Sequence, residues 1–408
     1  MSPAPAPPPP PRASTEPLQF RRLAVLIAAN FVDMLGFAMV LPLLPFYALH
    51  MDASPVVIGW IIASYSIAQL AAAPLWGRVS DHYGRRPALL IGLLGSALAF
   101  LVFGLADTLG LLFLSRIVQG ASGGTTGVAQ AYVADTVRPA DRARALGWLS
   151  AATSAGVMIG PAVGSLAARF GQEAPGLVAA GLCFLNVLFA WRWLPESRVH
   201  GEAPERKPIW HAAWQVVRHP ALPVSRLIWI YAVGMLAFTG LTSVFALFLE
   251  AEHGVTERTI GYFFAYIGAL SLVMRLLFLG PIVDRVGEQW VMRLGAGALA
   301  LGMFLYPLVQ SLPALILIMP LVPIGTALLF PATTALMSRN SDRRELGTIM
   351  GTAQTFAGIS RVLAPLAATA AFQRLGHGAP FWLAAASLLL VSLLAFRLRA
   401  AHIEPLLD

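Results

Sequence analysis

Apolar stretches of about twenty or more residues recur along the whole chain, and nothing else in the sequence constrains the fold as strongly. Each stretch is long enough to cross the ~30 Å hydrocarbon core of a bilayer as a helix. The stretches are continuously apolar and do not alternate, which favours helices over a transmembrane β-barrel. We therefore expect an all-α integral membrane protein. Its twelve predicted spans are residues 22–49, 56–78, 87–106, 109–134, 143–169, 173–194, 223–250, 257–281, 289–309, 313–338, 344–373 and 379–399.

Charge in this chain is scarce and unevenly placed. Charged residues make up 12% of the 408 residues, against roughly 25% in a soluble domain. The net charge of +8 could suggest a nucleic-acid partner, but its distribution indicates membrane topology instead. Most Lys and Arg residues fall in the tails and in the connections on one side, which places both termini in the cytoplasm. We expect a multi-pass membrane protein with no nucleic-acid partner. The basic residues elsewhere are Arg169, Arg258 and Arg374 on the other side, and Arg116, Arg275 and Arg361 within spans.

The chain also repeats itself. The loop Gly77-Arg-Val-Ser-Asp81-His-Tyr-Gly84-Arg85-Arg86 joins the second and third spans, and Gly280-Pro-Ile-Val-Asp284-Arg285-Val-Gly287 joins the eighth and ninth. Two six-span repeats around a central site are the architecture of alternating-access transporters. The expected divisions are a disordered Pro-rich cytoplasmic tail at 1–21, an N-terminal six-helix half at 22–195, a cytoplasmic linker at 196–222, a C-terminal six-helix half at 223–399 and a cytoplasmic tail at 400–408.

Asp33 is the only carboxylate deep within an apolar span. It lies about eleven residues beyond Arg22, or about 16 Å along a helix, which is near the middle of a bilayer. An ionisable side chain at that depth is costly and usually marks an ion path. The alternative is a neutralised acid in a helix-packing face. Asn30, Met34 and Phe37 share its face by their spacing, and the mixture suits bulky, partly cationic molecules.

Arg116 lies at a matching depth in the fourth span, on a polar stripe. It needs an acceptor because a guanidinium does not deprotonate, and Asp33 is the deep carboxylate available. Such a pair would let a proton and a drug compete for one carboxylate. Alternatively, Arg116 caps carbonyls or completes a structural network. Asp33 favours lipophilic cations or neutral molecules as substrates, whereas Arg116 would attract anions once Asp33 is protonated. The amides expected to line the substrate cavity are Asn30, Gln69, Gln119, Gln130 and Gln354.

The two repeated loops combine glycine, acid and arginine too far from mid-membrane to touch a substrate. We interpret them as a latch that stabilises an outward-open state by pairing with a neighbouring helix end and with the other half. The alternative is plain topogenic charge, which explains the arginines but not Asp81. The latch residues are Gly77, Asp81, Gly84, Arg85, Arg86, Gly280, Asp284 and Arg285.

Glycines recur every four residues in the fifth span, at Gly156, Gly160 and Gly164, with Pro161 among them. Small residues at this spacing let two helices approach closely, and neighbouring groups satisfy the carbonyl that the proline frees. We expect this face to seal the gap between the halves against proton leakage.

Nothing in the sequence indicates an enzyme. Gly120-Ala-Ser122-Gly-Gly124 has the form of a nucleophile elbow, but it lies in an apolar span without the preceding strand or a His partner. The sequence contains no phosphate-binding loop, dinucleotide fingerprint or zinc-ligand spacing. We therefore expect no cofactor and no metal, and transport driven by the proton gradient.

Four motifs resemble those of the major facilitator superfamily. The loop Gly77–Arg86 resembles its signature loop, and Leu112-Phe-Leu-Ser-Arg116-Ile-Val-Gln119-Gly120 is similar to the proton-coupling motif of its drug–proton antiporters. Gly156-Val-Met-Ile-Gly160-Pro161-Ala-Val-Gly164 resembles their antiporter motif. Asp33-Met-Leu-Gly36 with Leu41-Pro42-Leu-Leu-Pro45 resembles the first-span motif of the twelve-span group.

Residues 112–164 resemble the tetracycline–proton antiporters in particular. Those proteins carry an acid where this chain has Ala99, and another in the ninth span, where this chain has none. The resemblance implies a proton-coupled antiporter that exports lipophilic drugs, multidrug or tetracycline-like, by alternating access. The alternative is a proton-coupled metabolite symporter of the same fold. We expect a monomer in the lipid bilayer, with a small lipophilic molecule and protons as its substrates.

Overall fold

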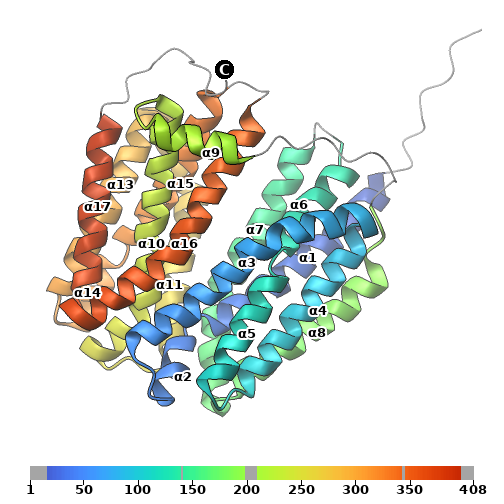
Figure 1. Cartoon of the computed structure of the whole chain (residues 1–408), viewed down its shortest axis with the longest axis horizontal. Coiled ribbons are helices and arrows are strands. Elements are labelled where there is room, and N and C mark those ends of the chain that lie inside the picture. The colour runs from blue at the N-terminus through green and yellow to red at the C-terminus, as the bar shows by residue number, and fades with distance from the viewer. Residues whose placement is uncertain (1–15, 139–140, 198–208, 342–344, 397–408) are drawn as a thin grey trace, which may run out of the picture.

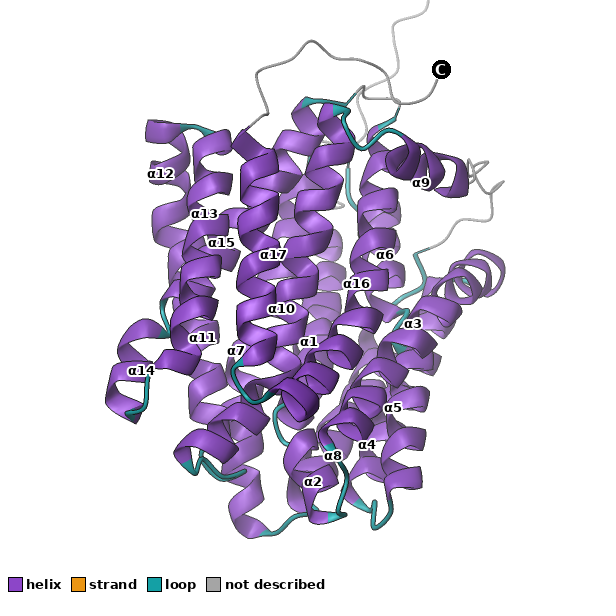
Figure 2. Cartoon of the chain, turned by 60° about the vertical axis from the view of Figure 1, so that its left-hand side comes forward, coloured by secondary structure: helices purple, strands orange, loops and turns teal. Residues whose placement is uncertain are grey.

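The computed structural model describes residues 16–138, 141–197, 209–341 and 345–396, and these form helices with short connections and no strand (Figure 1, Figure 2). The first group of helices is α1 (Glu16–Val40), α2 (Leu44–His50), α3 (Pro55–Tyr83), α4 (Arg85–Gly104), α5 (Leu109–Ser122), α6 (Thr125–Thr136), α7 (Arg142–Ala167), η1 (Ala168–Phe170) and α8 (Ala174–Trp193). The second is α9 (Ile209–Arg218), α10 (Pro223–His253), α11 (Ile260–Val273), η2 (Met274–Phe278), α12 (Leu279–Val286), α13 (Glu288–Leu305), η3 (Tyr306–Leu308), α14 (Leu312–Ile318), α15 (Leu321–Arg339), α16 (Leu346–Leu375) and α17 (Ala379–Phe396).

The all-helical prediction is confirmed. Within the described residues, ten helical stretches are long and apolar enough to cross a membrane. The predicted fourth span is divided into α5 and α6 at Gly123 and Gly124, and the twelfth contributes a shorter apolar stretch, Ala379–Leu390. The first span bends between α1 and α2, where Pro42 and Pro45 interrupt the hydrogen bonding of a continuous helix.

Local signals account for several helix ends. The Ser54 hydroxyl accepts a hydrogen bond from the Val57 N–H at the start of α3, which also has Pro55 in its first turn. Thr108 caps α5 in the same way. α10 ends at Gly254, which adopts the left-handed conformation with φ of 63°.

The two groups of helices lie side by side (Figure 1). Equivalent loops in the two groups share a strained backbone conformation, because Gly84 before α4 has φ of 104° and Gly287 before α13 has φ of 78°. Side chains other than glycine rarely adopt such angles. This recurrence supports an internal repeat.

The hydrogen bonds seen between the two groups lie at one end of the molecule, which we call the closed end. The Val56 N–H of α3 donates to Oε1 of Gln373 in α16 at 3.1 Å. Ser165 of α7 donates to the carbonyl of Glu257 at 2.8 Å and accepts from the Gly261 N–H of α11 at 2.8 Å. The helix pairs α3–α16 and α7–α11 therefore close the molecule at this end.

The opposite end carries the loop Gly77–Arg86 and the connection between the groups, and we call it the linker end. The predicted linker contains the helix α9, which the sequence did not indicate. In this helix Ala212 and Val216 are buried and Trp214 is exposed. At the amino terminus, α1 begins at Glu16, within the stretch predicted as a disordered tail. The rest of that tail, residues 198–208 of the linker and the tail 400–408 lie outside the described residues.

Candidate functional site

A cavity of about 980 Å³ lies between the two groups of helices. α1 and α7 form one wall, and α10, α11, η2 and α15 form the other. Serine and threonine hydroxyls interrupt a mostly apolar lining, and Arg275 is its one charged residue among those described. A cavity of this size with few polar groups is typical of a small-molecule site. Its aromatic residues are Phe37, Tyr231, Phe238, Phe245, Phe264 and Phe330.

Arg275 reaches this cavity from η2, a single π-helical turn between α11 and α12. π-helical turns are rare, and those that do occur are often found at functional sites. The neighbouring Leu276 and Leu277 are 70% and 63% exposed on the outside of the bundle. From the sequence, Arg275 could equally have extended to the membrane surface, so its place in the cavity is a finding of the structure.

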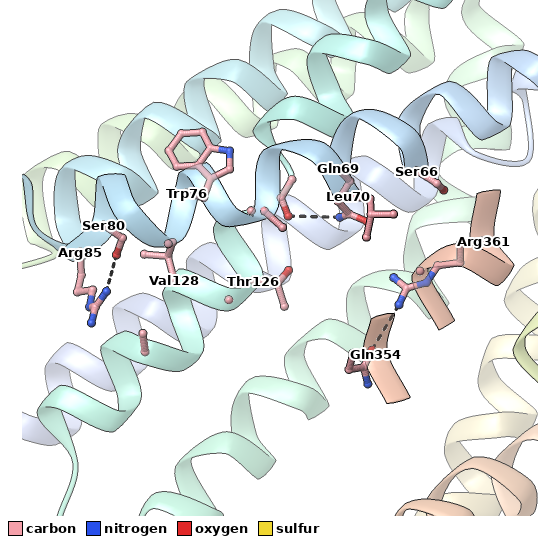
Figure 3. A pocket seen from close by; sticks show the side chains of 17 residues that line it. Ser66, Gln69, Leu70, Trp76, Ser80, Arg85, Thr126, Val128, Gln354 and Arg361 are labelled. Atoms are coloured by element: carbon pink, nitrogen blue, oxygen red, sulfur yellow. Dashed lines mark hydrogen bonds between the residues drawn. The ribbon is translucent and has the colours of Figure 1, made fainter. Parts of the chain in front are cut away.

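A second cavity of about 470 Å³ lies between α3 and α6 on one side and α16 on the other (Figure 3). Gln69 donates to the Tyr65 hydroxyl at 3.1 Å. Arg361 Nη2 donates to Gln354 Oε1 at 3.4 Å, and Gln354 Nε2 donates to the Tyr231 hydroxyl at 3.4 Å. Because Tyr231 also lines the larger cavity, these contacts connect the two cavities.

Asp33 is 7% exposed and lines neither of these cavities. Ser96 in α4 and Thr125 in α6 are the polar side chains that interact with its carboxylate. A small enclosed space beside it is lined by Asn30 and Thr125 as well as by apolar side chains. The acid therefore lies inside the first group of helices, sheltered from the space between the groups.

The predicted pair of Asp33 and Arg116 does not form in this structure. No ion pair joins the two among the described residues, although both are buried. Arg116 instead lies over the Tyr65 ring at 4.9 Å and the Phe37 ring at 5.9 Å, and donates to the Gln119 side chain. Aromatic faces and an amide oxygen thus stabilise the guanidinium without a carboxylate. This geometry agrees with the alternative of a structural network.

Of the residues predicted to line the substrate cavity, Phe37 lines the larger cavity, and Gln69 and Gln354 line the smaller one. Asn30 does not, because its amide donates to Thr153 at 2.7 Å and to the Leu149 carbonyl, which ties α1 to α7. The other three predicted residues also line neither of the two cavities. Met34 packs on Gly156, Gln119 is buried against Arg116, and Gln130 is exposed.

The glycines of α7 form a packing face, as expected, but its partner is α1 of the same group. A Cβ atom on Gly160 would lie 2.7 Å from both the Ala38 Cβ and the Leu35 carbonyl oxygen. Contact between the groups is made by other residues of α7, namely Pro161 and Ser165, which approach Gly261. The three glycines therefore pack within the first group while Pro161 of the same motif contacts the second, and sealing of the gap by this face stays a prediction.

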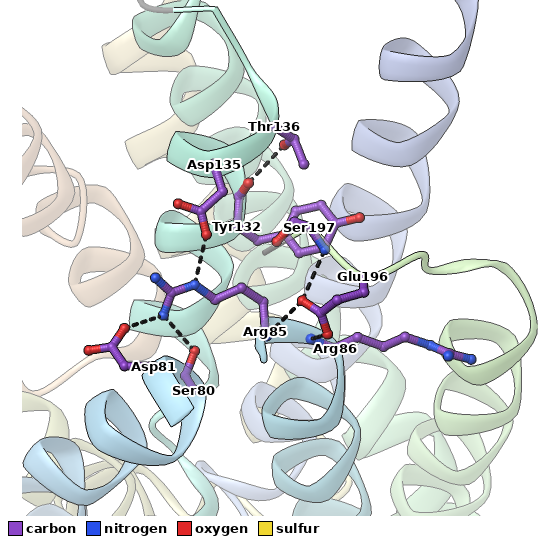
Figure 4. A network of polar contacts seen from close by, with 9 residues as sticks. All are labelled: Ser80, Asp81, Arg85, Arg86, Tyr132, Asp135, Thr136, Glu196 and Ser197. Atoms are coloured by element: carbon purple, nitrogen blue, oxygen red, sulfur yellow. Dashed lines mark hydrogen bonds and ion pairs between the residues drawn. The ribbon is translucent and has the colours of Figure 1, made fainter. Parts of the chain in front are cut away.

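The latch loop forms a polar network at the linker end (Figure 4). Arg85 pairs with Asp81 at 2.7 Å and with Asp135 at the end of α6 at 2.8 Å. Glu196 accepts hydrogen bonds from the backbone N–H groups of Arg85 at 2.9 Å and Arg86 at 3.1 Å, which caps α4 with a negative charge. The loop thus pairs with a neighbouring helix end, as predicted.

Among the ion pairs given for the described residues, none joins the latch loop to α12. Gly280, Asp284 and Arg285 are exposed on α12, and the ion pairs of Arg85 lie within the first group. Gly84 lies at the cap of α4, where a Cβ atom would meet Glu196, and Gly77 lines the smaller cavity. With the groups closed at the other end, the two halves of the proposed latch remain separate in this conformation.

Sequence reasoning missed four residues of these sites. From the sequence, Asp135 lies at the end of the fourth predicted span and Glu196 in the predicted linker, and neither position indicates that the residue lies next to the latch loop. Ser165 follows the glycine motif and gave no signal of its own. Arg275 was seen but not assigned to the cavity.

The chain matches the family model described as "Major Facilitator Superfamily" over residues 26–278 and 227–406. The chain belongs to the major facilitator superfamily. It is 31% identical over 394 residues to the class C tetracycline resistance protein of Escherichia coli, covering 92% of this chain and 96% of that protein. It is 27% identical to multidrug resistance protein 2 of Bacillus subtilis, covering 84% and 86%.

The fold agrees with solved members of the superfamily. A bacterial homologue of the human lysosomal transporter Spinster, solved in an inward-facing and unoccupied conformation, superposes with a TM-score of 0.77 at 15% identity and covers 93% of this chain and 97% of that one. Membership of the major facilitator superfamily makes this chain a multi-pass membrane transporter of small molecules and not an enzyme.

Proposed function

We propose that this protein is a proton-coupled antiporter that exports lipophilic small molecules by alternating access. The observation that carries the proposal is the 980 Å³ cavity built by both groups of helices, whose hydrogen bonds to each other, among the described residues, lie at the closed end. Its similarity to tetracycline and multidrug resistance proteins supports drugs as the cargo. The matching span-5 motif supports antiport.

The distribution of basic residues gives the orientation we propose. Arg85, Arg86 and the connection between the groups lie at the linker end, and the positive-inside rule assigns that end to the cytoplasm. The closed end then faces outward, in a bacterial cytoplasmic membrane, and the conformation is inward-facing. Substrate would enter the cavity from the cytoplasm. Formation of the latch between Asp81–Arg86 and Asp284–Arg285 would accompany the outward-facing state.

Asp33 is the proposed proton carrier. It lies on α1 between α4 and α6, and its carboxylate interacts with the side chains of Ser96 and Thr125. Protonation turns an acceptor-only group into one with a donor, so these interactions must rearrange. Since Thr125 begins α6 and Asp135 lies near its end, a shift of α6 would reach the latch at Arg85.

Transport by the purified protein in liposomes tests the proposal. Vesicles with an acidic lumen should accumulate a lipophilic substrate such as tetracycline, because each proton leaving the lumen exchanges for substrate that enters. Accumulation should collapse when the gradient is dissipated. A metabolite symporter of the same fold would require the reverse gradient, with the acidic side outside, and that result would contradict antiport.

A further inference from the structure

The charges that face the space between the two groups of helices are cationic. Arg275 lines the larger cavity, and Arg85 and Arg361 line the smaller one. No Asp or Glu is among the described lining residues of either cavity, and Asp33 lies outside both. A lipophilic cation bound in the larger cavity would contact no carboxylate among the described lining residues.

Arg275 and Arg361 differ from Arg85 in their ion pairs. Arg85 has two carboxylate partners, Asp81 and Asp135. Neither of the other two arginines makes an ion pair within the described residues; Arg361 makes only long contacts of 3.4 Å to an amide and a carbonyl oxygen. Arg275 is exposed in the open cavity and Arg361 is half-buried, so a molecule bound there can reach the donors of both. A bound acidic group would supply the missing charge in a favourable, two-point geometry.

The rest of the large cavity accepts an aromatic body. Rings of Tyr231 and Phe330 lie 5.5 Å apart and nearly perpendicular, and Phe238 lies 6.3 Å from Phe330. Such rings offer faces and edges on which a flat aromatic molecule stacks. Thr242 and Ser271 add hydroxyl groups to the same lining as Arg275. The lining is thus apolar and aromatic, with one fixed positive charge.

We propose that the substrates of this protein are aromatic organic anions, and that Arg275 binds their acidic group in the 980 Å³ cavity. This rests on the transport function proposed above and replaces the cation preference that Asp33 alone would indicate. The π-helical turn η2 supports it independently, because that turn interrupts the α11–α12 helix at the residue that faces the cavity.

Three probes with one ring system isolate the charge: 2-naphthoate is an anion, 2-naphthamide is neutral, and 2-naphthylmethylammonium is a cation. Equilibrium dialysis with the purified full-length protein measures each affinity without any gradient. Naphthoate should bind about tenfold more tightly than the amide, and the ammonium probe more weakly than both, because a hydrogen-bonded charge pair has roughly that worth. Arg275→Gln should lower naphthoate affinity about tenfold and leave naphthamide unchanged.

Arg275→Lys should retain part of the selectivity, since a lysine keeps the charge but not the planar fork. Arg258→Gln is the matched control, because Arg258 is exposed at the closed end and lines neither cavity. The selectivity of the unmodified protein decides the matter even if a variant fails to fold. Equal or stronger binding of the ammonium probe, undiminished naphthoate binding by Arg275→Gln, or no binding of naphthoate would overturn the inference.

Binding and transport separate the two proposals. Arg275-dependent naphthoate binding without gradient-driven movement of naphthoate in liposomes would contradict antiport and support the anion site. Gradient-driven accumulation of ethidium with no affinity for naphthoate would support antiport and contradict the anion site.

Discussion

Arg85 in the latch loop pairs with Asp135 near the end of α6, with 2.8 Å between Nε and Oδ2. The same helix begins at Thr125, whose side chain interacts with the Asp33 carboxylate. α6 is separated from α5 by the break at Gly123 and Gly124, so it is a short, independent segment. One helix therefore connects the proposed proton site with the proposed latch, a distance of about 15 Å for ten residues.

Asp33→Asn should abolish gradient-driven transport. The amide keeps the size of the side chain and its contacts with Ser96 and Thr125, but it cannot exchange a proton, so coupling is lost while folding persists. Transport in liposomes under an imposed pH gradient checks this, with thermal unfolding as the test of integrity. Asp107→Asn, in an exposed loop at the closed end, should transport normally. Undiminished accumulation by Asp33→Asn would show that another group carries the proton.

Latch substitutions should slow turnover and spare binding. Asp81→Asn or Asp135→Asn each removes one carboxylate partner of Arg85 and should cut turnover about tenfold. Affinity should stay within about twofold, because the loop makes no contact in the larger cavity and acts through the balance of conformations. Dialysis and transport on the same preparation separate the two quantities. Lost affinity with normal turnover would place the loop in the binding site.

Gly160→Ala should destabilise the protein by about 1–3 kcal/mol, the usual range for an overpacked contact. The added methyl group would lie 2.7 Å from the Leu35 carbonyl oxygen of α1, which is backbone and cannot move aside alone. Gly181→Ala in α8 is the control, because nothing lies within 4 Å of its Cβ position. Thermal unfolding in detergent compares them. Equal unfolding temperatures would show that α1 and α7 separate easily.

Much of the fold follows from the sequence because a bilayer leaves helices as the way to satisfy the backbone of each apolar run. Even the bend after α1 has a visible cause in Pro42 and Pro45. The helix α9 was missed because Ile209–Arg218 is too short and too polar on one face to resemble a span, and its stability comes from packing Ala212 and Val216.

The depth of the candidate site residues in the membrane could be predicted from the sequence, but the side chains that they contact could not. The positions of Asp33 and Arg116 along their spans place both within the bundle, as expected. Which groups they meet depends on the rotation of each helix about its axis, and that is set by packing of the whole bundle. Arg116 faces Tyr65 and Phe37, while Asp33 faces Ser96. The sequence does not assign Arg275 to the cavity, because the π-helical turn changes the face of the helix on which this residue lies.

Proton-coupled export is tested most directly by following protons while substrate moves down its own gradient. Liposomes that contain the protein, a trapped pH-sensitive dye and a substrate such as tetracycline or 2-naphthoate are diluted into substrate-free buffer at the same pH. Antiport predicts that substrate leaving the lumen draws protons in, so the lumen acidifies, and that Asp33→Asn abolishes the signal. The direction does not depend on how the protein is oriented in the vesicle. A lumen that becomes alkaline, as symport requires, or one whose pH stays constant while substrate leaves, would contradict the proposed function.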